Sequence, residues 1–167
     1  MNNSRGEGDP AVMAKQRIGL VVWTVSLLTV GITACAGGSQ SMHTPEDAKA
    51  EALQLLRKTE KAVDVSWPDT PEPTAEQCDD GVRFAYLVPV SVDNDAKATA
   101  KSLRQFWESE GLRVSPSETD FGARGTLYSA TADRDGAAGA AYQISSTSVA
   151  VQVTSPCATG SVHDYDE

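Results

Sequence analysis

Histidine, cysteine and aromatic residues are scarce in this chain, whose 167 residues include two histidines, three cysteines and 6% aromatic side chains. Serine-dependent catalysis usually requires a histidine base, yet His43 and His163 both stand outside the segments with a helix or strand pattern. No nucleophile elbow, phosphate loop or Cys/His spacing typical of a metal site occurs. We therefore expect no enzymatic activity, no cofactor and no bound metal.

Basic residues are also few, with 14 lysines and arginines against 23 aspartates and glutamates. Residues 35–167 carry 11 basic and 21 acidic side chains, a net charge of −10. Nucleic-acid binding needs a basic surface that displaces counterions, and anionic lipid headgroups repel acidic segments. The charge argues against a nucleic-acid partner and against a domain that lies flat on a membrane. The hydrophobic content of 40% is ordinary for one globular domain.

Long apolar runs are scarce, and the clearest is Ile18 to Ala34, 17 residues without a charge that follow Lys15 and Arg17. As a helix the run would span roughly 26 Å, slightly less than the ~30 Å hydrocarbon core of a bilayer. A basic segment followed by a short apolar one is typical of a secretory signal peptide. No Arg-Arg pair precedes the run, which favours the general secretion route over the twin-arginine route.

The apolar run ends in Ile32-Thr33-Ala34-Cys35, which resembles the bacterial lipobox. The resemblance implies that residues 1–34 are removed and that Cys35 carries the lipid. The alternative is an uncleaved signal anchor with a cysteine near its outer end. Residues 35–44 are rich in alanine, glycine and serine and predict a flexible tether. We expect a partner membrane, bound through the N-terminal lipid at the outer face of the cytoplasmic membrane.

The start of translation has two candidates. Beginning at Met1 places Glu7 and Asp9 before the apolar run, where a signal peptide needs a basic segment. Beginning at Met13 gives a short segment whose only charges are basic. The residues favour Met13 but leave both starts open.

The other two cysteines, Cys78 and Cys157, make an even pair in an exported domain. Such a pair predicts a disulfide. The competing interpretation, a metal site with His43 or His163, would need ligands from distant segments. Neither cysteine belongs to a Cys-x-x-Cys motif, so we expect a structural bond.

Two helices are predicted. The first begins after Thr44, the expected N-cap, and runs from Pro45 to about residue 62. The second runs from about residue 95 to 110, with Asp93 or Asn94 as the expected cap and Gly111 just past its end. Its aromatic residues, 106 and 107, fit a buried stripe better than a ligand pocket.

Five strands are predicted, and the first, residues 82–92, has the clearest alternation of apolar and polar residues. The segment from Trp67 to Cys78 looks too polar and proline-rich to form an element.

The expected fold is α+β, a two-layer sandwich with one mainly antiparallel five-stranded sheet and both helices on one face. A Cys78–Cys157 bond would make the first and last strands antiparallel neighbours. The domain is expected over 45–158, with a disordered acidic tail at 159–167. The remaining four strands are expected at 112–117, 126–132, 140–145 and 149–155.

The chain resembles small uncharacterised lipoproteins of high-GC Gram-positive bacteria. The resemblance rests on the lipobox, the order of elements, the helix end from Phe106-Trp107 to Gly111-Leu112, and the final Ser155-Pro156-Cys157. The resemblance implies location and fold but no chemistry. We expect a non-catalytic binding or accessory module of the cell envelope, whose partner is an envelope protein or a small-molecule ligand. The alternative is an envelope hydrolase that uses a carboxylate pair such as Asp79-Asp80, or Glu108 with Glu110.

Replacing the lipobox cysteine tests the anchor. In a host that processes lipoproteins, Cys35→Ala should abolish both lipid labelling and cleavage by the lipoprotein signal peptidase, because no other side chain at that position can form the thioether. Metabolic labelling with a fatty acid and the size of the exported protein provide the readout. Unchanged labelling and processing in the variant would refute the assignment.

Overall fold

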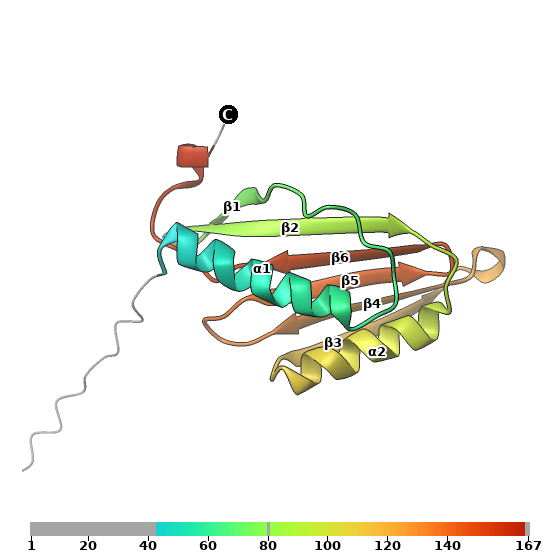
Figure 1. The fold of residues 1–167 in the computed structure, drawn as a ribbon. Coiled ribbons are helices and arrows are strands. Elements are labelled where there is room, and N and C mark those ends of the chain that lie inside the picture. The colour runs from blue at the N-terminus through green and yellow to red at the C-terminus, as the bar shows by residue number, and fades with distance from the viewer. Residues whose placement is uncertain (1–42, 80, 166–167) are drawn as a thin grey trace, which may run out of the picture. The chain divides into compact units, whose positions relative to one another are not determined.

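A computed structural model describes residues 43–79 and 81–165, which form an α+β fold (Figure 1). The expected signal peptide, Cys35 and the first residues of the expected tether lie outside the described residues. None of the described helices is long and apolar enough to cross a membrane. The elements are α1 (Pro45–Lys61), β1 (Thr74–Cys78), β2 (Gly81–Ser91), α2 (Ala96–Ser109), β3 (Arg113–Asp120), η1 (Gly122–Arg124), β4 (Thr126–Asp133), β5 (Gly139–Ser145), β6 (Ser148–Thr154) and η2 (Val162–Tyr165), where η denotes a 3-10 helix.

The sheet has six strands in the order β1-β2-β6-β5-β4-β3, with every neighbouring pair antiparallel. The prediction of an antiparallel sheet with two helices is confirmed, but the count of five strands is wrong. The additional strand, β1, lies in the segment that was expected to be a connector. It is a short edge strand with no fully buried side chain, so its sequence shows no alternation. Asp79, with a φ of 32°, follows β1 in the turn to β2.

Strand β2 pairs with β6, which confirms that the first predicted strand and the last are antiparallel neighbours. Strand β1 covers only Gly81 to Ala85 of β2, so the rest of β2 has an open side. Pro89 lies in this uncovered part, where its missing N–H removes no bond to β1. Pro89 therefore occupies the locally exposed edge of an inner strand.

The helix caps explain where both helices begin. The Thr44 hydroxyl accepts a hydrogen bond of 3.2 Å from the Asp47 backbone N–H, which confirms the predicted N-cap of α1. In α2 the cap is Asp95, whose Oδ1 accepts from the Ala98 N–H at 3.0 Å. The expected caps, Asp93 and Asn94, are therefore wrong by one or two residues, because Asp95 is the residue that reaches the first free amide.

The core lies between the helices and the alternate side chains that the strands direct to a common face. Helix α1 packs against β2 and β6, whereas α2 packs against β3, β4 and β5 (Figure 1). Trp107 of α2 is completely buried, as expected of a core residue, and its indole N–H donates to the Thr59 hydroxyl of α1 at 3.0 Å. The central ladder is formed by Val90 opposite Val149, Val88 opposite Val151 and Tyr86 opposite Val153.

The chain that leaves β6 is held against β2. Val82 and Ala158 exchange two backbone hydrogen bonds, of 3.0 Å and 2.8 Å. A Cβ atom on Gly81 would collide with the Ala158 carbonyl oxygen, so this approach requires glycine. Beside it the sulfur atoms of Cys78 and Cys157 lie at disulfide distance, with their Cα atoms 6.1 Å apart. The covalent link and the paired backbone therefore fix the same end of the sheet.

The structure differs from the expectation of a disordered tail over residues 159–165. Residues 162–165 form η2, and the Tyr165 ring meets the Phe84 ring edge to face with centroids 5.0 Å apart. The Lys49 ammonium lies 4.4 Å from the centroid of the Phe84 ring and 4.8 Å from that of Tyr165. These aromatic contacts hold the segment in place even though its composition is polar and acidic.

Loss of the Cys78–Cys157 bond should lower the melting temperature by many degrees. The cysteines are 79 residues apart, and the chain-entropy model gives roughly 4 to 5 kcal/mol as an upper figure for such a loop. About 1 kcal/mol corresponds to roughly 4 to 8 °C in a domain of this order. Thermal unfolding before and after reduction, with thiol titration as the control, measures the effect. An unchanged midpoint in protein with two titratable thiols would contradict a structural role.

Candidate functional site

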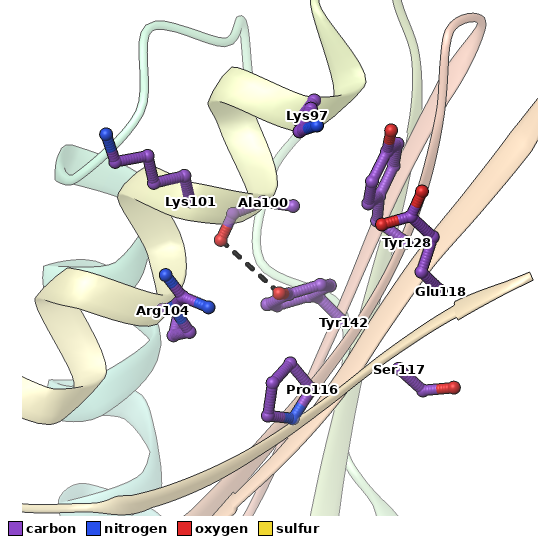
Figure 2. A pocket seen from close by; sticks show the side chains of 9 residues that line it. All are labelled: Lys97, Ala100, Lys101, Arg104, Pro116, Ser117, Glu118, Tyr128 and Tyr142. Carbon is purple, nitrogen blue, oxygen red and sulfur yellow. Dashed lines mark hydrogen bonds between the residues drawn. The ribbon is translucent and has the colours of Figure 1, made fainter.

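A pocket of about 330 Å³ opens between α2 and the β3 side of the sheet, and we call it the α2–β3 pocket (Figure 2). One wall is formed by α2 and the opposite wall by β3 and β4, with β5 below. Ligand sites of proteins commonly begin at this size. The lining residues are Lys97, Ala100, Lys101, Arg104, Pro116, Ser117, Glu118, Tyr128 and Tyr142.

The floor of the pocket is the ring of Tyr142. Tyr142 follows the inward alternation of β5 and is only 4% exposed. Its hydroxyl donates to the Ala100 carbonyl oxygen at 3.3 Å, and its ring lies 5.3 Å from the Trp107 ring, centroid to centroid. Burial raises the pKa of the Tyr142 phenol, an effect that the positive charge of Arg104 partly opposes. The floor is therefore a neutral aromatic surface at physiological pH.

The helix wall of the pocket is basic. Lys97, Lys101 and Arg104 stand at positions i, i+4 and i+7, which lie on one face of a helix. Within residues 43–79 and 81–165, neither lysine forms an ion pair or a side-chain hydrogen bond. Two ammonium groups without a protein counter-ion therefore border a pocket in a strongly acidic domain.

The Arg104 guanidinium carries a hydrogen-bond donor that the described protein does not satisfy. Its Nε atom is buried and has no hydrogen-bond partner, although 40% of the whole side chain is exposed. The carboxylate of Glu108 lies 3.8 Å from Nε, beyond hydrogen-bond distance. Leaving a buried donor unpaired costs about 1 to 3 kcal/mol, more for a charged group. The site thus lacks an acceptor beside Arg104.

The strand wall places one acidic group across from this basic face. Strand β3 is the edge of the sheet, and its register sets Glu118 opposite Tyr128 and Pro116 opposite Ala130. In Figure 2 the side chains of Glu118 and Tyr128 stand on the far side of Tyr142 from Lys101. Three cations and one carboxylate therefore surround an apolar floor.

The residues that the sequence singled out do not form this pocket. Cys35 lies outside the described residues, and Cys78 and Cys157 meet at the end of β1. Among the residues that the structure describes, no three His, Cys, Asp or Glu side chains gather to hold a metal. None of these positions lines the pocket.

The acidic pairs considered for a hydrolase are also elsewhere. Glu110 forms a 2.6 Å ion pair with Lys58, and Glu108 faces Arg104. Asp79 occupies the turn between β1 and β2, and Asp80 lies outside the described residues. Glu108 and Glu110 share neither of the two described cavities, because only Glu110 borders one of them.

Sequence reasoning missed all three basic residues of the pocket. Their i, i+4, i+7 spacing was visible within the predicted second helix, and in a chain of net charge −9 a basic helix face is an informative exception. Tyr142 was placed in a predicted strand, but no local pattern indicates that its ring lies under a helix residue 42 positions earlier in the chain. Its partner, Ala100, is known only from the tertiary structure.

Comparison with protein-family models, with curated proteins and with solved structures finds no match for this chain. The functional argument therefore depends on the chemistry of the α2–β3 pocket. The residues that line the pocket offer charged and aromatic groups that can bind a ligand.

Replacing Tyr142 should alter how stability responds to alkaline pH. Because the pKa of Tyr142 is raised above its ordinary 10.0 in the folded chain, the unfolded chain releases this proton first. The stability that the neutral phenol contributes is complete below about pH 10 and is lost as the pH rises through the raised pKa. Tyr142→Phe should therefore lose less stability than wild type between about pH 9 and pH 11. Urea unfolding measures this, and equal pH dependence would contradict the buried placement of the phenol.

Proposed function

We propose that this protein is a non-catalytic binding module of the cell envelope, held by lipid on Cys35 at the outer face of the cytoplasmic membrane, and that it binds a small molecule in the α2–β3 pocket. The observation that carries the binding function is the pocket itself, with an aromatic floor, a basic wall and an unsatisfied donor. Small-molecule sites characteristically combine an apolar lining with a few polar groups that orient the ligand.

The position of the pocket at the margin of the sheet supports this assignment. The two helices contact different strands, α1 the β2–β6 half and α2 the β5–β4–β3 half. Strand β3 is the edge of the sheet, contacts α2 and leaves most of its side chains exposed. A pocket at this margin is open to solvent and is bounded by regular secondary structure, which holds its side chains in fixed relative positions.

The lipobox supports the location, and the Gly/Ser-containing segment after Cys35 supports a tethered domain. A module held near the membrane by two acyl chains stays there durably, because each buried methylene contributes about 0.8 kcal/mol. The acidic surface keeps such a domain away from anionic headgroups. The pocket then faces solutes of the envelope space.

Native mass spectrometry of the exported protein tests the binding function. Wild type extracted from the envelope should carry a non-covalent adduct that is released on collisional activation. Glu118→Trp adds a ring at the pocket wall and should remove the adduct. The matched control is Thr119→Trp, since Thr119 is the next residue of the same edge strand and does not line the pocket. The proposal fails if wild type carries no adduct, or if both variants retain it equally.

A further inference from the structure

We infer that the ligand of the α2–β3 pocket is an amphipathic organic anion, in which a flat apolar body carries one acidic group such as a carboxylate, phosphate or sulfonate. This inference rests on the proposed binding function and specifies the chemistry of its ligand. The anionic group lies among Lys97, Lys101 and Arg104, and the apolar body lies over Tyr142.

The charges around the pocket select an anion. Residues 35–167 have a net charge of −10, yet three of the four charged residues of the pocket are cations. The single carboxylate, Glu118, stands on the opposite wall. Lys97 and Lys101 are exposed and have no counter-ion in the described chain, so their charges remain available to a ligand. An acidic domain that concentrates cations at one cavity attracts anions there specifically.

The geometry of Arg104 selects an oxyanion over a halide or a neutral polar group. A guanidinium presents its N–H donors in a planar fork that matches two oxygens of a carboxylate, phosphate or sulfonate. Arg104 makes no hydrogen bond within the described chain and 40% of its side chain is exposed, so its terminal N–H donors are available to an oxygen of the ligand. Arg104 is therefore the residue that positions the acidic group, and the two lysines add long-range attraction.

The floor selects the rest of the ligand. Tyr142 is almost fully buried and its hydroxyl already donates to the Ala100 carbonyl, so it offers the ligand an apolar contact rather than a hydrogen bond. Pro116 and the half-buried Tyr128 continue the apolar surface toward the opening. Flat groups stack favourably on aromatic rings and on proline. A volume of about 330 Å³ accommodates one or two fused rings but excludes a folded polymer chain.

Two dyes with the same ring system separate the anion inference from the binding function. The anionic probe is 1-anilinonaphthalene-8-sulfonate, and its neutral counterpart is N-phenyl-1-naphthylamine. With the lipid-free exported domain, fluorescence titration should give an affinity about tenfold higher for the sulfonate, a difference of about 1.4 kcal/mol. Raising the salt concentration from about 0.01 M to about 0.15 M should lower the affinity for the sulfonate dye only, because the Debye length shortens from roughly 30 Å to about 8 Å.

Charge reversal at the rim provides the matched variants. The double variant Lys97→Glu/Lys101→Glu should lower the affinity for the sulfonate dye about tenfold and change the affinity for the neutral dye by no more than about twofold. Lys61→Glu reverses one exposed lysine at the end of α1, which does not line the pocket, and should leave both affinities unchanged. Both lysines of the double variant are exposed, so circular dichroism should confirm an intact fold.

The outcomes distinguish two failures. If both dyes bind the wild type equally and the double variant has no effect, the pocket binds ligands but the anion inference is wrong. If neither dye binds, or if Glu118→Trp leaves the binding of both dyes intact, the proposed binding function fails with it. If the double variant loses affinity for the sulfonate dye and keeps its affinity for the neutral dye, the inference is supported.

Discussion

The hydrogen bond from the Trp107 indole to the Thr59 hydroxyl joins the two helices, and the rest of the structure depends on where it holds α2. Both residues are completely buried, and the bond measures 3.0 Å. The same indole lies against the ring of Tyr142, whose hydroxyl binds the Ala100 carbonyl on the preceding turns of α2. This closed set of contacts ties α1, α2 and β5 together. It also sets the distance between α2 and the sheet, and so determines whether a pocket exists beside them.

Charge and packing serve different purposes in this domain. The core is held by aliphatic and aromatic residues at alternate strand positions, whereas the surface is acidic and favours solubility. The basic face of α2 contributes little to stability, because exposed lysines without partners gain almost nothing from folding. We propose that this basic face, which borders a cavity in an acidic domain, serves ligand binding.

Much of the fold could be predicted from the sequence, because its signals are local. The alternation of apolar and polar residues predicted β2 and β6, and the N-cap residue Thr44 predicted the start of α1. Strand β1 was not predicted because an exposed edge strand needs no alternation of apolar and polar residues. The ordered structure of residues 162–165 was not predicted because it depends on the contact between the Tyr165 and Phe84 rings. The pocket was not predictable for the same reason. Its basic residues follow one helix, but its floor comes from a strand that is brought beneath them only by tertiary packing.

The central claim is that Trp107 couples the helix layer to the pocket floor, and a double-mutant cycle tests it most directly. Thr59→Val removes the acceptor of the indole while keeping the shape, and Tyr142→Leu removes the ring that the indole faces. Because both residues contact Trp107, the free energies of unfolding of the two single variants and the double variant should be non-additive by about 0.5 to 3 kcal/mol. Additivity within about 0.3 to 0.5 kcal/mol would show that the two contacts are independent and would contradict the account.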